Sequence, residues 1–341
     1  MKNITTLGVA ALLLVSTAAH AQTERSFSDV APDHPAYEAV EYLKSQGIIG
    51  GYDDGTFQPS RKVNRAEAVK IIAAPRISAD AFEELKKTAI GFTDVPQDAW
   101  YVPFLAAAVN AFKFIDGPPK RTAFEGSRPV LKAEFVKMLL VANGVDSSAT
   151  FGEIQDPLSA DVQDRGEWYY SHMRTAIAYS LTQVNEEENL SPGVELSRGD
   201  VALIMHRFLM FQEERRTQAL LSEAESEITR ILDALGRNDS AAASRAATRS
   251  ILAARGAHMQ RSDSPVTRGA VKISQAFQQL VLGYLAGLEQ NFDATVTAAK
   301  AAWSLAQEAQ QINPDIGTII DQVRQTAEKM ANDARALGGK G

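Results

Sequence analysis

The 341-residue sequence contains no cysteine. This absence excludes disulfide bonds, cysteine-ligated zinc or iron–sulfur sites and a cysteine nucleophile. A surplus of basic residues is also missing, because the formal net charge is −7 and the pI is about 5.4. Proteins that bind nucleic acids normally present a basic face, so the composition argues against a nucleic-acid partner. The chain must fold by burying apolar side chains, without covalent cross-links.

Motifs for catalysis and metal binding are missing too. The sequence has no Gly-x-Ser-x-Gly elbow, no phosphate-binding glycine loop and no His-Glu-x-x-His pair. Asp53-Asp54-Gly55 lacks the alternating acids and the terminal Glu of an EF-hand loop, so we interpret it as a turn. We expect no catalytic residue, no cofactor and no metal site. Carboxylates are abundant, however, so counting them does not exclude a glycosidase pair.

No apolar run reaches the roughly 20 residues that a membrane-spanning helix needs. The longest run covers residues 7–15, after Lys2 and before Ala19-His20-Ala21. This order of positive charge, short apolar core and small residues is typical of a secretory signal peptide at residues 1–21. We therefore expect an exported chain with no transmembrane segment after cleavage.

Two regions of different composition meet near Phe211. Between Gln22 and Phe211 there are 19 basic and 27 acidic residues, whereas from Gln212 onward there are 15 of each. The second region is rich in alanine and has only four aromatic residues. We predict one acidic region that ends near residue 211 and a separate helical region at 212–341.

The acidic region contains a repeated pattern. Phe27-Ser28-Asp29-Val30 recurs 65 residues later as Phe92-Thr93-Asp94-Val95, and we interpret Phe151-Gly152-Glu153-Ile154 as a degenerate third copy. An aromatic residue and a helical apolar pattern follow each copy, and then a loop rich in turn residues. Internal repeats of this size predict units that stabilise one another by packing.

A second helix is predicted in each repeat from a polar opening signal. The three signals are Asn64-Arg65-Ala66-Glu67, Leu131-Lys132-Ala133-Glu134 and Ser197-Arg198-Gly199-Asp200. In the first and third, a capping residue precedes an acid by three positions, which is the spacing of a reciprocal N-terminal cap. Apolar residues at helical spacing follow every signal, so each repeat should fold as helix, loop, helix.

These residues resemble the S-layer homology family. The first copy is the best match, since it combines FSDV, the loop GIIGGYDDGTFQP and NRAE, a variant of the family's Thr-Arg-Ala-Glu signature. The second copy has Lys132 in place of the signature arginine, and the third has an altered loop. The resemblance implies an all-α fold in which three repeats, at 22–90, 91–150 and 151–211, form a three-pronged spindle of helices.

The resemblance also implies a function, which is non-covalent attachment of an exported protein to the cell wall or envelope. The implied partner is a wall polysaccharide, either a pyruvylated secondary polymer or another peptidoglycan-linked glycan. A pyruvate ketal is a fixed carboxylate, which the planar fork of an arginine can bind through both oxygens. A helix N-terminus would add unpaired N–H groups.

On this mapping Arg65 is the leading carboxylate ligand, and Lys132 and Arg198 are the corresponding cations. Gly51 and Tyr52 would give close backbone approach and a surface facing the sugar. The alternative for Arg65 is a solvated charge, or an ion pair with Glu67 or with an acid of the next repeat. The remaining motif residues are expected to be structural: Asp29, Asp94, Glu67 and Glu134.

Trp100 and Trp168 follow the repeat starts and have two interpretations. Either they stack on sugar rings, or they pack in the core between prongs. The sequence favours packing.

The alanine-rich region is predicted to be helical throughout. No glycine or proline lies between Gly199 and Leu235, so we expect one rod of about 37 residues across that span. Further helices are expected from Ser240 to Met259, from Ser264-Pro265, from Asn291 and from Asn313-Pro314. A four- or five-helix bundle is the simplest arrangement.

Three functions remain open at this point. The first is wall anchoring, with 212–341 displaying or recruiting a partner. The second is a structural S-layer or envelope-tethering protein that forms a homo-oligomer through 212–341. The third, a wall-active enzyme with its site in 212–341, has no motif to support it.

Overall fold

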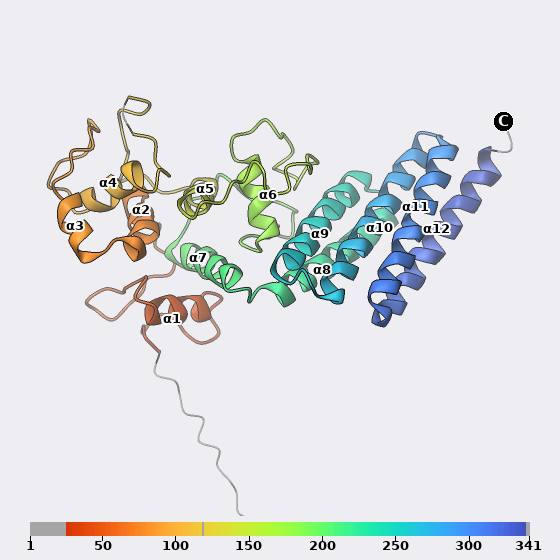
Figure 1. The fold of residues 1–341 in the computed structure, drawn as a ribbon, viewed down its shortest axis with the longest axis horizontal. Coiled ribbons are helices and arrows are strands. Elements are labelled where there is room, and N and C mark those ends of the chain that lie inside the picture. Colours follow the sequence, from red (N-terminus) through yellow and green to blue (C-terminus); the bar gives the residue numbers. More distant parts are fainter. Residues whose placement is uncertain (1–24, 118, 339–341) are drawn as a thin grey trace, which may run out of the picture.

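A computed structural model describes residues 25–117 and 119–338, and Figure 1 shows their arrangement. The predicted signal peptide lies outside the described residues. The described chain is all-α, as the sequence predicted, with only isolated β-bridges. Three units at one end of the molecule form a spindle, and five long helices stand side by side at the other end (Figure 1).

Each unit of the spindle contributes two main helices. We define unit 1 as residues 27–73, unit 2 as 92–142 and unit 3 as 158–212. Their helices are α1 (Tyr37–Ser45) and α2 (Arg65–Ala73), α4 (Val102–Asn110) and α5 (Lys132–Ala142), and α6 (Tyr170–Ala178) and α7 (Arg198–Gln212). A short helix, α3 (Ala79–Leu85), links units 1 and 2 and packs Phe82 against Phe104 of α4 with tilted rings.

The three units are joined at the centre by a closed ring of backbone hydrogen bonds. Val63 N–H donates to the Leu196 carbonyl (3.0 Å), Leu196 N–H donates to Val130 (3.0 Å), and Val130 N–H donates to Val63 (2.9 Å). All three side chains are buried. Because each bond crosses between units, the ring cannot form unless all three are present.

Helix pairing also crosses between units. The second helix of each unit packs on the first helix of the next: α2 on α4, α5 on α6, and α7 on α1. Each unit is helix, loop, helix as predicted, but its two helices do not pair with each other; they pair with helices of the neighbouring units. The exchange follows from the ring, which turns each second helix toward its neighbour.

The loop of each unit is fixed by one aspartate. Asp29 accepts from the N–H groups of Phe57 and Gln58 (both 2.7 Å), and Asp94 accepts from those of Phe124 and Glu125 (2.8 and 2.7 Å). In each loop the second N–H donor, Gln58 or Glu125, has a positive φ, and these bonds stabilise that conformation.

In unit 3 the equivalent acid is Asp161, which accepts from Leu190 and Ser191 N–H (both 2.8 Å). The interpretation of Phe151-Gly152-Glu153-Ile154 as the third repeat start is therefore wrong. Glu153 instead forms an ion pair with Arg255. Leu158-Ser159-Ala160-Asp161-Val162 carries one extra residue before the aspartate, which hides the match in the sequence.

The predicted 37-residue rod is also wrong, because a turn separates α7 from α8 (Thr217–Gly236). Glu214 has φ 58°, which ends α7. The turn is held by Gln260, whose amide donates to the Phe211 carbonyl (2.7 Å) and accepts from Arg216 N–H (3.1 Å). Local sequence lacks a breaker here, so a residue 44 positions away supplies the stop.

Four helices follow α8 in the described residues: α9 (Ser240–Gln260), α10 (Pro265–Leu288), α11 (Phe292–Ile312) and α12 (Gly317–Gly338). The first three begin at the predicted positions, whereas a 3-10 turn at Pro314–Ile316 separates the predicted opening Asn313-Pro314 from α12. Asp239 and Asn291 cap α9 and α11 through their side chains. Each helix packs mainly on the next, so the five form an open row, which we call the helix row. Among the described residues, we find no helix with the length and apolar character to span a membrane.

The helix row is attached to unit 3 of the spindle. Helix α9 packs on α6, and Leu220, Ala224 and Leu252 belong to the same apolar core as the spindle. Arg249 of α9 is 2% exposed and contacts Glu227 (2.7 Å), Glu188 of unit 3 (3.4 Å) and the Leu158 carbonyl (3.0 Å). Buried apolar and ionic contacts therefore fix the helix row to unit 3.

Candidate functional site

The three signature cations occupy equivalent positions at the first residue of α2, α5 and α7. Each reaches across to the loop of the next unit. Arg65 Nε donates to the Phe124 carbonyl (3.1 Å), Lys132 Nζ to Leu190 (2.7 Å) and Arg198 Nε to Phe57 (2.7 Å). Each cation therefore joins two units, and an arginine keeps further N–H groups that Lys132 does not have.

The helix N-termini behind these cations are not available to an anion. The N–H groups of Arg65 and Ala66 donate to the carbonyls of Arg128 and Gly126, and equivalent bonds are made at Lys132 and at Arg198. The expected unpaired N–H groups are thus used for contact between units. Any charge recognition must come from side chains.

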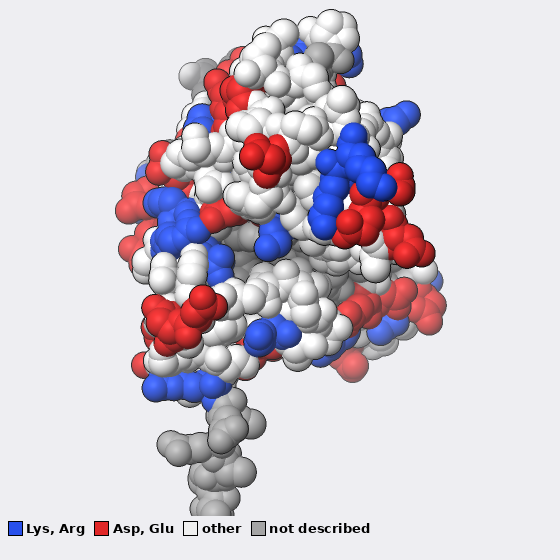
Figure 2. Space-filling model, turned by 90° about the vertical axis from the view of Figure 1, so that its left-hand side faces the viewer, with Lys and Arg blue, Asp and Glu red and all other residues white. Residues whose placement is uncertain are grey.

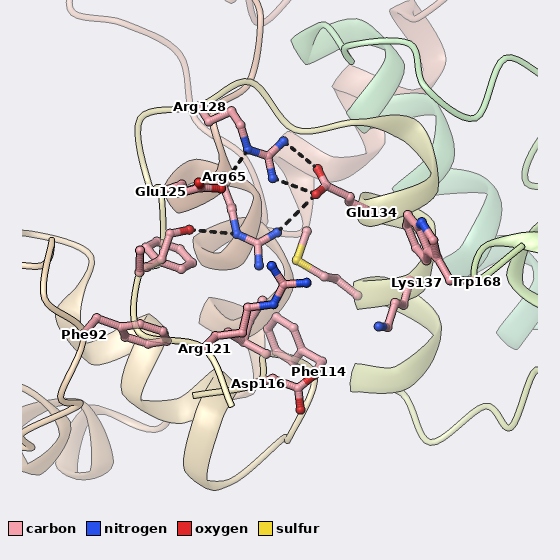
Figure 3. A pocket seen from close by; sticks show the side chains of 14 residues that line it. Arg65, Phe92, Phe114, Asp116, Arg121, Glu125, Arg128, Glu134, Lys137 and Trp168 are labelled. Atoms are coloured by element: carbon pink, nitrogen blue, oxygen red, sulfur yellow. Dashed lines mark hydrogen bonds and ion pairs between the residues drawn. The ribbon is translucent and has the colours of Figure 1, made fainter. Parts of the chain in front are cut away.

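Groove A is an open cavity of about 380 Å³ between units 1 and 2, closed on one side by Trp168 of unit 3 (Figure 3). Its lining residues are Arg65, Phe92, Phe114, Ile115, Asp116, Arg121, Ala123, Phe124, Glu125, Arg128, Glu134, Lys137, Met138 and Trp168. Arg65 lies over the Phe124 ring with 5.4 Å from guanidinium carbon to ring centroid. The groove thus combines cations with an aromatic wall.

Glu134 organises the cations in groove A. Its carboxylate accepts from Arg128 through both guanidinium nitrogens (3.0 and 2.7 Å) and from Leu131 N–H (3.0 Å), and it lies 3.7 Å from Arg65. Although burial acts to raise it, the pKa of Glu134 is lowered by these bonds and charges. One acid therefore neutralises Arg128 and only partly balances Arg65.

Groove B is the equivalent cavity, about 340 Å³, between units 3 and 1. It is lined by Ile48, Ile49, Gly50, Gly51, Tyr52, Arg61, Glu67, Lys70, Ile71, Ala74, Trp100 and Arg198. Arg198 takes the place of Arg65, and the ion pair of Arg61 with Glu67 takes the place of Arg128 with Glu134. Glu67 also closes the predicted cap with Asn64.

Both tryptophans lie at the surface, with Trp100 53% and Trp168 51% exposed. The favoured prediction of core packing is therefore wrong. Each ring forms a groove wall beside a lysine, with Lys70 Nζ 5.7 Å from the Trp100 ring and Lys137 Nζ 5.6 Å from the Trp168 ring. An exposed ring that faces a cavity is available to stack on a ligand.

Gly51 and Tyr52 shape groove B in different ways. A Cβ at Gly51 would overlap the Phe27 ring and lie 2.6 Å from the Thr56 carbonyl oxygen, so this glycine permits close packing of the loop. The Tyr52 hydroxyl accepts from Arg61 Nε (2.6 Å), and its ring centroid lies 5.1 Å from the Arg198 guanidinium carbon. Tyr52 thus positions both arginines of the groove.

The third position, around Lys132, lacks these groups. The residue four positions before the signature cation is Arg61 in unit 1 and Arg128 in unit 2, but Val194 in unit 3. The residue five positions after it is Lys70 in unit 1 and Lys137 in unit 2, but Leu203 in unit 3. The tryptophan is replaced by Pro35, one residue before the N-cap residue of α1 in unit 1. Lys132 donates to a carbonyl here, and of the groove side chains only the acid is retained, as Asp200 near Lys132.

The sequence analysis missed five of the groove cations: Arg61, Arg128, Lys70, Lys137 and Arg121. Four of them could have been found, because they lie at constant offsets of −4 and +5 from Arg65 and Lys132. Arg121 has no counterpart in the other loops and carries no repeat signal. The structure thus adds a set of basic side chains to the predicted ligands.

Burial changes the acid–base properties of the signature cations. Burial lowers the pKa of Arg65, Lys132 and Arg198, and around Arg65 the charges of Arg128 and Arg121 act in the same direction against Glu134. Acidic and basic side chains are interspersed on the end of the molecule that Figure 2 shows. Within the described residues no group of three potential metal ligands comes together.

Residues 26–69 match the family model of the S-layer homology domain. The chain carries an S-layer homology domain. The matched segment covers most of unit 1 and includes Asp29, Arg61 and Arg65. Three repeats of this family remain a prediction, although units 2 and 3 reproduce the loop and ring contacts of unit 1.

Relatives with known names are surface proteins. The chain is 29% identical over 175 residues to the surface-layer 125 kDa protein of Lysinibacillus sphaericus, and these residues are 50% of this chain and 14% of that protein. It is 23% identical over 195 residues to the cellulosome-anchoring protein of Acetivibrio thermocellus (55% and 39%). It is 45% identical over 60 residues to the outer membrane protein SlpA of Thermus thermophilus (18% and 6%). These similarities place the chain among exported proteins attached to the cell envelope.

Proposed function

We propose that this protein is held at the cell surface by grooves A and B, which bind a wall polysaccharide carrying anionic groups. The observation that supports this most directly is the repetition of one constellation. A half-buried arginine, an ion-paired arginine, a lysine and an exposed tryptophan occur together twice, each drawn from three different units. A purely structural role would not require both tryptophans to remain exposed.

The constellation suits a charged sugar. The tryptophan offers a flat apolar surface for the ring face of a sugar, and the arginine offers directional donors for a carboxylate such as a pyruvate ketal. The lysine between them adds a mobile charge. Because the region through Phe211 is acidic, attraction must be local to the grooves rather than a property of the whole surface.

The relatives support the same function from another direction. Their names describe surface layers and the anchoring of a cellulosome, which are attachment roles. The chain spans only 14% of the Lysinibacillus protein, so what the rest of that protein does is not transferred. We infer a binding protein rather than an enzyme.

The helix row has a separate role in this proposal, which is to display or recruit a partner. The outer side of α12 is polar, since its buried residues form a single stripe: Ile320, Val323, Ala327, Ala331 and Ala334. Homo-oligomerisation through 212–341 is the alternative, and the mass of the protein as a function of concentration would separate the two.

A pull-down on purified sacculi tests wall binding, with sacculi used before and after mild acid removal of pyruvate ketals. We expect Arg65→Ala and Arg198→Ala each to weaken binding at least about tenfold, because each loses a charge-assisted contact. Lys132→Ala is the matched control, since it removes the equivalent cation where no equipped groove exists. Equal loss in all three variants, or binding by none of the proteins, would contradict the proposal.

A further inference from the structure

Grooves A and B differ at one position of the loop that borders each of them. The loops align through equivalent hydrogen bonds, since Ser28 N–H donates to the Gly55 carbonyl (3.0 Å) and Thr93 N–H donates to that of Thr122 (2.8 Å). One residue earlier, Asp54 in unit 1 corresponds to Arg121 in unit 2. The same loop position therefore carries opposite charges beside the two grooves.

Arg121 extends into groove A. Figure 3 shows its guanidinium beside that of Arg65, on the cavity side. Among the described residues Arg121 has no ion-pair partner: Glu134 contacts Arg65 and Arg128, and Asp116 contacts Lys120 (3.5 Å). Two guanidinium groups that converge without an acid between them repel each other, and a bound anion would relieve this repulsion.

Groove B has no such convergence. Arg61 is already paired with Glu67, which leaves Arg198 and Lys70 as its available cations. Asp54 turns back on its own loop and accepts from Thr56 N–H (2.9 Å) and Thr56 Oγ1 (2.6 Å). Asp54 is not among the residues that line groove B, so this loop adds no cation to groove B, whereas the equivalent loop adds Arg121 to groove A.

We infer that groove A takes a doubly charged phosphoryl group, held between Arg65 and Arg121, whereas groove B takes a singly charged carboxylate. The inference rests on the proposed function, because it specifies which anion of a wall glycan each groove prefers. A phosphoryl dianion has three acceptor oxygens, enough to meet two guanidinium forks at once. A carboxylate has only two oxygens, and a single bidentate pair with one guanidinium uses both of them.

The three tryptophans of the chain allow each groove to be observed separately. Trp168 reports on groove A, Trp100 on groove B, and Trp303 in α11 is an internal reference. We would record their indole N–H signals by NMR, assigned with Trp→Phe variants, while titrating the mature protein with methyl phosphate or acetate at pH 7.5. Methyl phosphate should bind at least about tenfold more tightly at Trp168 than at Trp100, and acetate should show no such preference.

Two variants test the role of Arg121. Arg121→Asp places the unit 1 residue type in groove A and should abolish the preference for methyl phosphate. Lys120→Asp makes the same charge change one residue away, outside the groove lining, and should retain it. Equal affinities at the two indoles in the wild type, or an unchanged preference in Arg121→Asp, would overturn the inference.

A released wall glycan, with and without its phosphoryl esters, separates this inference from the proposed function. If the glycan shifts both indole signals and loss of phosphoryl esters weakens only the Trp168 response, both proposals are supported. If the glycan shifts both signals equally with or without phosphate, wall binding stands and the phosphoryl preference fails. If the glycan shifts neither signal while methyl phosphate still selects Trp168, the phosphoryl site stands for a soluble ligand and wall binding fails.

Discussion

Unit 3 and units 1 and 2 share one backbone framework but use it differently. All three units have an aspartate that accepts two backbone N–H groups of the loop. In each unit the second of these N–H donors has a positive φ, and each unit contributes one bond to the central ring. Units 1 and 2 add Arg61, Arg128, Lys70 and Lys137 to the grooves. Unit 3 has Val194 and Leu203 at those positions, and its loop residue Glu188 pairs with Arg245 and Arg249 of the helix row.

The comparison shows that framework and surface vary independently. Backbone hydrogen bonds and buried side chains define the repeat, whereas the side chains around each groove are free to change. In unit 3 those changes coincide with attachment of the helix row. Unit 3 thus supplies Trp168 and Arg198 to the grooves, while α6 and Glu188 contact α9 of the helix row.

The strongest test of this attachment is Arg249→Ala. The substitution leaves the Glu188 and Glu227 carboxylates without their shared cation in a buried site, so we expect the free energy of unfolding to fall by about 3–5 kcal/mol. Arg261→Ala is the control, since its pair with Glu214 is exposed and should contribute less than about 1 kcal/mol. Urea unfolding followed by circular dichroism measures both, and similar losses would show that the buried cluster does not hold the two regions together.

A second test changes only the packing between the two regions. A Cβ at Gly256 of α9 would overlap the Ala178 carbonyl at the end of α6, so Gly256→Ala should destabilise the protein by about 1–3 kcal/mol. Gly236→Ala has open space around it and should be neutral or stabilising, because alanine favours a helix by roughly 1 kcal/mol over glycine. We expect the midpoint of thermal unfolding to fall in Gly256→Ala and to stay the same or rise in Gly236→Ala. If neither substitution changes the midpoint, the contact between α6 and α9 is not tightly packed.

A third and smaller expected effect is a pH dependence of the free energy of unfolding that comes from unit 3 and has no counterpart in unit 2. His172 in α6 corresponds to Phe104 in α4, and burial together with the charge of Lys137 lowers the pKa of His172 to about 4. The unfolded chain therefore binds more protons at this histidine than the folded chain between about pH 4 and 6.5. The free energy of unfolding is highest with respect to His172 above pH 6.5, and it decreases as the pH falls through that window.

Between pH 7 and pH 4, His172→Phe should lose about 1–2 kcal/mol less of its free energy of unfolding than the wild type does. The expected difference is smaller than the full pKa shift implies, because the ring is partly exposed and solvent screens its charge. Chemical unfolding at pH 7 and at pH 4, compared between the two proteins, gives the difference directly. His206, whose pKa burial also lowers, is present in both proteins and cancels. A difference that does not change with pH would contradict the assignment to His172.

Much of the fold could be predicted from local signals. The capping residues Asn64, Ser197, Asp239 and Asn291 each lie where a helix begins, because a cap satisfies backbone groups of the next few residues. The break after Gln212 could not be predicted, since Gln260 makes it from a distant helix. The third repeat start was misplaced because one inserted residue disturbed the motif, whereas the bonds of Asp161 are unmistakable.

By itself the sequence determined the all-α composition, the positions of most helices and the identity of the signature cations, because these depend on residues close together in the chain. Only the tertiary structure decided how the units exchange helices and which cations share a groove. Groove A draws Arg65, Arg121 and Trp168 from three units, and no local pattern records that they meet. The ring through Val63, Val130 and Leu196 brings them together, since its bonds form only between units.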